Sequence, residues 1–111
     1  MQVRRENKND VTVFYATGEM NINTVPDLKV VFHKIIEEKL GKVLLNFEEV
    51  EYIDSLGLAT LLFFSKELKA VGGQMIMSNI SPKVSSIFKI TKVDQVLRIF
   101  DAEKEALKHF E

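Results

Sequence analysis

The stretch VLLNFEEVEYIDSLGL, residues 43–58, decides the fold of this chain. Residues 43–47 are apolar without alternation, which is typical of a strand buried on both faces of a sheet. A second apolar segment begins near Leu56 and continues at helical spacing. Asp54 and Ser55 lie between the two, where the strand gives way to the helix. We therefore expect a strand–helix unit with a hydroxyl group at the positive end of the helix.

The segments before this unit predict a strand pair and a helix. Residues 11–16 are β-branched and aromatic and predict a strand. Val3 and its neighbours are expected to pair beside it across a turn at residues 7–10. Thr24, as an N-cap, predicts a helix that is closed by Gly41.

The segments after the unit continue the alternation. We expect, in order, a helix to Val71 stopped by two glycines, a strand over residues 74–78, a helix over residues 82–90 capped by Ser81, a strand over residues 96–100, and a terminal helix to Phe110 capped by Asp101. Strands that alternate with helices predict a mostly parallel sheet with crossovers. The expected fold is α/β, with a small mixed, largely parallel β-sheet and about four helices, in a single domain over residues 1–111.

Composition narrows the classes of protein that fit. The 15 Lys and Arg residues nearly balance the 16 Asp and Glu residues, and a nucleic-acid-binding domain would normally show a basic excess. There is no cysteine, so neither disulfides nor thiolate chemistry are expected. The N-terminal residues are polar, and no apolar run reaches the roughly 20 residues needed to cross a bilayer. We expect a cytoplasmic protein that binds neither nucleic acid nor a membrane directly.

Three roles are open to the Ser55 hydroxyl. The first is a helix cap, for which Asp54 is the other candidate. The second is the nucleophile of an enzyme, and the third is a phosphorylation site. A nucleophile needs a base, and the two histidines, His33 and His109, fall inside a helix and beside the C-terminus. The G-x-S-x-G motif of hydrolases is absent. We therefore expect no catalytic residue, while the cap and the phosphorylation site stay open.

Acidic residues gather near the same junction without predicting a metal site. Glu48, Glu49, Glu51 and Asp54 are not joined by histidine or cysteine, and their spacing matches no calcium loop. We interpret them as a solvated acidic rim. Neither a metal nor a cofactor is expected.

The helix after Ser55 carries a second signal, on its outward side. At about 100° per residue, one broad face is expected to pack on the sheet, formed by Leu58, Leu61, Leu62, Phe64, Leu68 and Val71. Phe63 projects almost opposite that face, in a stripe with Leu56 and Ala59. Such a stripe beside Ser55 indicates a surface for a protein partner.

Residues 50–58 (VEYIDSLGL) resemble the phosphorylation segment of the bacterial anti-sigma factor antagonists, which are members of the STAS domain family. Residues 16–20 resemble the strand end before the first helix, residues 71–75 the glycine turn into the next strand, and residues 80–84 the following helix start. The resemblance therefore covers essentially the whole chain in order.

The resemblance implies a partner switch. The unphosphorylated protein would bind an anti-sigma factor that is also a serine kinase, and so release the sigma factor. The kinase would phosphorylate Ser55, which would abolish binding, and a phosphoserine phosphatase would reset the protein. The alternative is a STAS interaction subunit of a stress-signalling scaffold or a transporter regulator.

The partner-binding residues expected on this basis are Asp54, Leu56, Gly57, Ala59, Phe63, Asn21 and Glu19. Two of them depart from the family pattern. Leu56 stands where the family commonly has Ser or Thr, which leaves Ser55 as the only hydroxyl at the junction. Asn21 stands where the family usually has an acidic residue, so hydrogen bonding is kept and a charge is lost.

Overall fold

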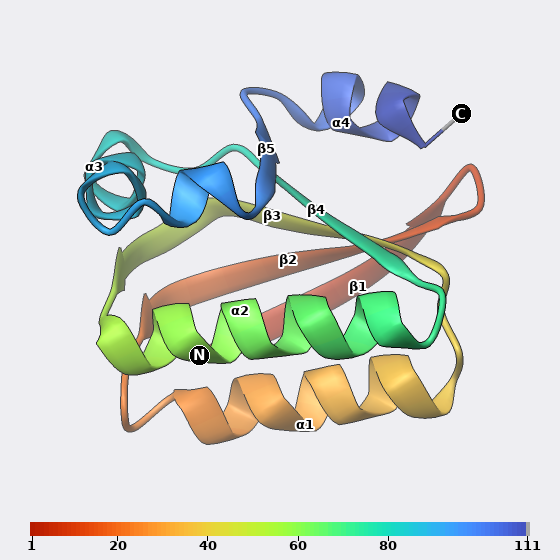
Figure 1. Cartoon of the computed structure of the whole chain (residues 1–111), viewed down its shortest axis with the longest axis horizontal. Helices are drawn as coiled ribbons and strands as arrows, with labels where there is room; N and C mark the ends of the chain where they lie inside the picture. Colours follow the sequence, from red (N-terminus) through yellow and green to blue (C-terminus); the bar gives the residue numbers. More distant parts are fainter. Residues whose placement is uncertain (111) are drawn as a thin grey trace.

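The computed structural model describes residues 1–110, which form a five-stranded sheet with helices on both faces (Figure 1). The elements are, in order, β1 (Gln2–Lys8), β2 (Val11–Met20), α1 (Val25–Glu37), β3 (Lys42–Ile53), α2 (Ser55–Ala70), β4 (Gln74–Ser78), α3 (Pro82–Ile90), the short 3-10 helix η1 (Val93–Gln95), β5 (Arg98–Phe100) and α4 (Glu103–His109). The predicted α/β fold with a largely parallel sheet and four α-helices is confirmed.

The strands lie in the order β1-β2-β3-β4-β5, so β1 and β5 form the two edges of the sheet. β1 runs antiparallel to β2 through a turn at Asn9 and Asp10, both with positive φ. The pairs β2–β3, β3–β4 and β4–β5 are parallel. Because parallel neighbours end at the same edge, the carboxyl ends of β2 and β3 meet where α1 and α2 begin.

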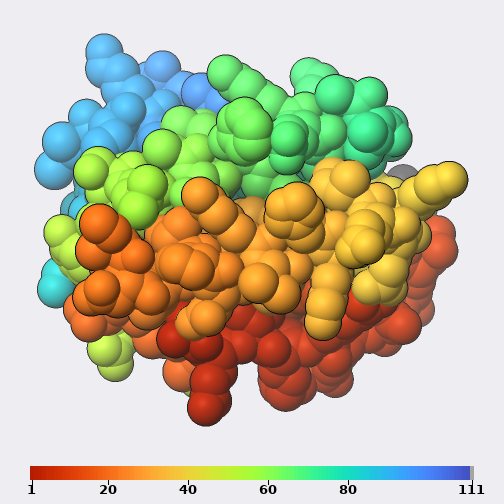
Figure 2. Space-filling view, turned by 90° about the horizontal axis from the view of Figure 1, so that it is seen from below, coloured from red at the N-terminus to blue at the C-terminus, as the bar shows by residue number. Residues whose placement is uncertain are grey.

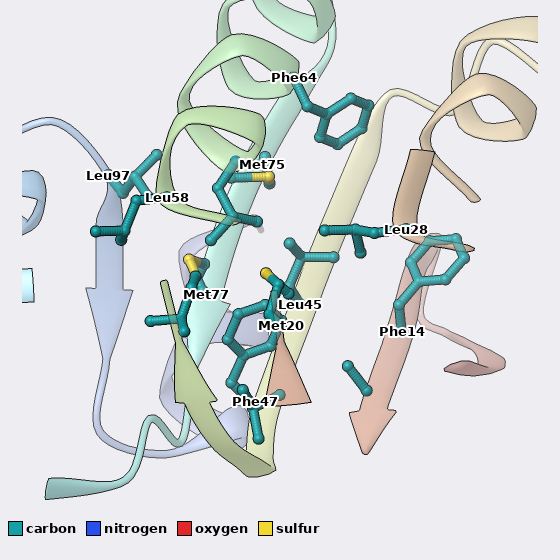
Figure 3. Packing of buried hydrophobic residues seen from close by; sticks show 14 of the residues in the cluster. Phe14, Met20, Leu28, Leu45, Phe47, Leu58, Phe64, Met75, Met77 and Leu97 are labelled. Atoms are coloured by element: carbon teal, nitrogen blue, oxygen red, sulfur yellow. The ribbon is translucent and has the colours of Figure 1, made fainter. Parts of the chain in front are cut away.

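The main core lies between the sheet and the helices α1, α2 and α3. Figure 3 shows Leu28 of α1, Leu58 and Phe64 of α2, and strand residues such as Leu45 and Met77 gathered in one layer. The centre of β3 is buried on both faces, as predicted for residues 43–47. α1 and α2 therefore lie side by side on one face of the sheet (Figure 1).

The helix α4 covers part of the opposite face. Ala106 and Phe110 pack there on residues from β2, β3 and β4. At the start of α4, the Glu103 carboxylate accepts hydrogen bonds from Lys8 Nζ at 2.7 Å and from Asn46 Nδ2 at 3.1 Å. This polar network ties the last helix to β1 and β3.

Two predicted helix boundaries were wrong. α1 ends at Glu37 and is followed by Lys39 with a φ of 56°, so the left-handed position is not at Gly41. Asp101 does not cap α4, because Ala102 occupies the N-cap position without a side-chain hydrogen bond. Thr24 occupies the N-cap position of α1 as predicted, although its side chain makes no capping hydrogen bond.

Three predicted strands also differ in extent. β2 continues beyond residue 16 to Met20, and β3 continues beyond residue 47 to Ile53. β5 begins only at Arg98, because Val96 and Leu97 form a turn that follows η1, with both N–H groups bonded to Val93 O. The strand β4 and the helix α3, with the Ser81 Oγ cap on Val84 N, are confirmed as predicted.

Candidate functional site

The β3–α2 junction is fixed against the end of β2. Met20 pairs with Ile53 in the sheet register. Asp54 N donates a hydrogen bond to Met20 O at 3.0 Å, which continues the pairing one residue beyond the strand. The start of α2 is therefore held by two neighbouring strands.

Asp54 is the residue that caps α2. Its backbone is extended, with φ −96° and ψ −178°, and its Oδ1 accepts a hydrogen bond from Gly57 N at 2.8 Å. That bond satisfies one of the free N–H groups of the first helical turn. Ser55 follows as the first residue of the helix, and it is exposed. Of the two candidate caps, Asp54 makes the bond, and the Ser55 hydroxyl faces solvent.

Gly57 sets how closely α2 sits on β2. It is buried, and a Cβ atom at this position would lie 2.8 Å from both Ile53 Cγ1 and Met20 Cγ. Such a distance is far inside ordinary van der Waals contact, so any side chain here would push the helix off the sheet. Gly57 was predicted to belong to the partner surface, but it is buried between α2 and the sheet.

The outward stripe of α2 is present. Phe63 is 64% exposed and Leu56 is 39% exposed, and Ala59 between them is also exposed. The inner face is formed by Leu58, Leu61, Phe64 and Leu68, all buried, with Leu62 partly buried. Val71 was wrongly placed on this inner face. It is 64% exposed because α2 ends at Ala70, where the chain turns toward the glycines.

A groove of about 490 Å³ runs between α1 and α2. Phe32 and Phe64 stack under it with ring centroids 3.8 Å apart. Ala59 and Phe63 line it from α2, and His33 lines it from α1. Figure 2 views the molecule from this side, with α1 (orange to yellow) across the middle and α2 (green) next to it. The outward stripe therefore borders a hollow that apolar side chains can enter.

The STAS domain family model matches residues 2–106, nearly the whole chain. The chain belongs to the STAS domain family. A Thermotoga neapolitana protein described as a candidate anti-sigma factor antagonist is 30% identical over 100 residues, which cover 89% of this chain and 88% of that protein.

Two solved structures agree with this family. The crystal structure of a candidate anti-sigma factor antagonist from Thermotoga maritima superposes with a TM-score of 0.89 at 25% identity, covering 96% of this chain and 92% of that one. The anti-sigma factor antagonist SpoIIAA from Bacillus, in its unphosphorylated form, superposes with a TM-score of 0.73 at 25% identity, covering 98% and 97%. By homology, this STAS domain falls among the anti-sigma factor antagonists.

The acidic residues of the STAS domain divide between two places. Glu19 and Glu51 are exposed near the ends of β2 and β3. Glu49 instead accepts a hydrogen bond from Thr17 Oγ1 at 3.3 Å, and together with Glu48 it lines a separate polar hollow. Within residues 1–110, no group of three or more His, Cys, Asp and Glu side chains is arranged to hold a metal ion.

The two histidines of the STAS domain lie away from Ser55. His33 lines the groove beside the middle of α2. His109 lies on α4, with its ring centroid 5.4 Å from that of Phe100 and its Nδ1 3.3 Å from Arg98 Nη2. The described part of the chain also contains no helix long and apolar enough to cross a bilayer.

The loop between β2 and α1 contains Ile22, an exposed apolar residue that the sequence patterns did not single out. Asn21 is partly buried, and its side-chain oxygen accepts backbone hydrogen bonds within the loop. Its neighbour Ile22 is 70% exposed. Ile22 stands alone between polar residues, so neither helical nor strand periodicity marks it.

Proposed function

We propose that this STAS domain is an anti-sigma factor antagonist controlled at Ser55. Its unphosphorylated form binds an anti-sigma factor that is also a serine kinase, and the sigma factor is released. The proposal rests on the separate roles of Asp54 and Ser55 at the start of α2. Asp54 caps the helix, so the exposed Ser55 hydroxyl is not needed for the fold and stands beside the apolar stripe of Leu56 and Phe63.

Phosphorylation at Ser55 is well suited to break a complex without unfolding the domain. A phosphoryl group brings about −1.5 to −2 charge at neutral pH. The N-terminus of α2, a helix of 16 residues, accepts that charge. A partner covering Leu56 and Phe63 would meet new charge and bulk at the edge of its contact, and it would have to desolvate the phosphate. Release therefore needs only a local change.

In this proposal the chain is a binder and a kinase substrate, and not a catalyst. It uses no metal or cofactor and works in the cytoplasm without contacting nucleic acid. The kinase supplies the ATP chemistry, and a separate phosphoserine phosphatase restores the hydroxyl. The existence of an unphosphorylated form of the relative SpoIIAA supports phosphorylation as the switch.

The first experiment maps the phosphorylated residue. The wild-type chain is incubated with the purified anti-sigma factor kinase of the same organism and ATP, and the site is located by mass spectrometry. We expect phosphate on Ser55 and none on the Ser55→Ala variant. Phosphate on another residue, or a stable complex with no phosphate transfer, would contradict the role of Ser55.

The second experiment measures binding and stability together. Ser55→Asp is expected to weaken kinase binding at least tenfold while the melting temperature stays within a few degrees of wild type. Ser86→Asp is the matched control, because Ser86 is an exposed serine on α3. An equal loss with both variants would mean that added charge weakens binding from anywhere on the surface. If the native host yields a scaffold or a transporter as the bound partner, the alternative STAS role replaces this one.

A further inference from the structure

The β2–α1 loop, residues 21–24, is an ordered turn. Asn21 Oδ1 accepts hydrogen bonds from Asn23 N at 2.9 Å and from Thr24 N at 3.2 Å. Thr24 Oγ1 donates to Glu19 O at 2.7 Å and accepts from Asn21 N at 2.8 Å. The Thr24 side chain thus bonds backward into the loop, which explains why it does not cap α1. Together these bonds fix the backbone on both sides of Ile22.

Ile22 is presented to solvent by this turn. It is 70% exposed, although a β-branched apolar residue is a poor choice for a solvated turn, where Gly, Asn, Asp and Ser dominate. Its neighbours Asn21 and Asn23 follow the usual preference, and Ile22 does not. A single exposed apolar residue is ordinary on a protein surface, so Ile22 matters for binding only if it adjoins the exposed Leu56 and Phe63 of α2.

The turn stands beside the start of α2. Met20, two residues before Ile22, accepts the hydrogen bond from Asp54 N, which lies two residues before Leu56. The β2–α1 loop and the start of α2 therefore lie side by side at the carboxyl ends of β2 and β3 (Figure 1). The apolar surface that begins with Leu56 and Phe63 on α2 thus gains a second side on the β2–α1 loop.

We propose that Ile22 is an apolar anchor of the docking surface and that Asn21 is a positioning residue that holds it in place. The inference rests on the proposed function, and its occupant is the anti-sigma factor kinase. The contacting patch of the kinase has an apolar centre and a rim of lysine and arginine. The basic rim follows from charge complementarity, because Glu19, Glu51 and Asp54 carry negative charge at this edge.

Lys83 is a positively charged residue whose charge partly offsets that of the three carboxylates. Its Nζ lies 5.3 Å from the ring centroid of Tyr52, the residue that pairs with Glu19 in the register. Three carboxylates with one neighbouring ammonium leave this edge negative. Binding should therefore weaken as the salt concentration rises. Affinity that does not respond to salt would remove the basic rim from the proposal.

The test compares two exposed isoleucines. Ile22→Ser is expected to weaken binding of the purified, ADP-bound kinase about 5- to 30-fold, the effect of leaving about 70% of an isoleucine side chain unburied in the complex. Ile90→Ser is the control, because Ile90 is 82% exposed on α3. It should bind as wild type. Both affinities are measured by calorimetry.

The role of Asn21 is tested by rescue and by coupling. Asn21→Ala loses both loop hydrogen bonds and should weaken binding to a similar extent as Ile22→Ser. Asn21→Asp keeps an oxygen acceptor for Asn23 N and Thr24 N and adds a charge that the basic rim would attract, so it should bind at least as tightly as wild type. If Asn21 acts through Ile22, the double variant Asn21→Ala/Ile22→Ser should bind no more weakly than the worse single variant. Additive losses would show that Asn21 contacts the partner itself.

The outcomes separate this inference from the proposed function. If Ile22→Ser binds as wild type while Phe63→Ala binds more weakly, the anchor role of Ile22 is refuted and the function stands. If Ile22→Ser and Ile90→Ser lose affinity equally, the effect does not belong to the loop and the inference falls. If the kinase neither binds nor phosphorylates the wild-type chain, both proposals fall.

Discussion

Replacing Phe63 with alanine tests whether the outward face of α2 serves binding or folding. Full burial of a phenylalanine side chain is worth about 1.5–3 kcal/mol, so the roughly one third of Phe63 that is covered in the free chain contributes about 0.5–1 kcal/mol to folding. A docked partner would cover the exposed two thirds. That burial is worth about 1–2 kcal/mol, or about a 5- to 30-fold change in Kd.

Two assays on the same protein samples separate the two contributions. Urea unfolding gives the free energy of unfolding, and calorimetry with the purified kinase gives the Kd. Val71→Ala is the control, because Val71 has the same 64% exposed fraction but lies just past the end of α2, outside the groove. We expect Phe63→Ala to lose affinity with little loss of stability, and Val71→Ala to change neither measurably.

Either of two results would refute this reasoning. A loss of more than about 3 kcal/mol in the free energy of unfolding is the size found for core phenylalanines, and would mean that Phe63 supports the fold. An unchanged Kd, with the kinase still bound, would mean that the partner does not cover the groove between α1 and α2.

Three further predictions concern the frame around Ser55 and the anchoring of α4. Asp54→Ala should lower the free energy of unfolding by about 0.5–2 kcal/mol because it removes the N-cap, whereas Ser55→Ala should leave it nearly unchanged in urea titrations. Gly57→Ala should destabilise by about 1–3 kcal/mol through overpacking against Met20, and thermal unfolding would detect it. Burial tends to raise the pKa of Glu103, but the hydrogen bonds from Lys8 and Asn46 and the nearby Tyr15 hydroxyl outweigh it and hold that pKa below its ordinary value. The ionised carboxylate therefore stabilises the fold at neutral pH, and this stability is lost as the pH falls from about 4.5 through the lower folded pKa. The melting-temperature advantage of wild type over Glu103→Gln should thus shrink between pH 6 and pH 3.

Local signals explain which elements could be predicted from the sequence. β4 and α3 have the predicted bounds, since two glycines precede the strand and Ser81 with Pro82 starts the helix. Near the C-terminus the residue pattern was misleading. It predicts Val96 as part of a strand, but η1 occupies the preceding residues and leaves Val96 exposed. It also predicts Asp101 as the cap of the last helix, but α4 begins two residues later, at Glu103.

The candidate site was predictable where one helix defines it. Helical spacing alone places Phe63 outward on α2, and the structure agrees. Asn21 and Glu19 entered the expected site only through the family resemblance. No residue pattern places the β2–α1 loop beside α2, because that neighbourhood depends on the pairing of Met20 with Ile53, two residues far apart in the sequence. The division of the acidic residues was hidden for the same reason. Glu49 pairs across strands with Thr17, and the residue pattern of β3 alone does not show which face it takes.

The two edge strands of the sheet affect the concentration that the free protein can reach in a cell before it aggregates. β1 carries the charged residues Arg4, Arg5, Glu6 and Lys8, and Arg5 is held by Glu38 through two hydrogen bonds of 2.8 Å. β5, at the other edge, is only three residues long. Charged or very short edge strands resist pairing with the strands of another chain. Edges of this kind let the chain reach a high concentration without aggregating.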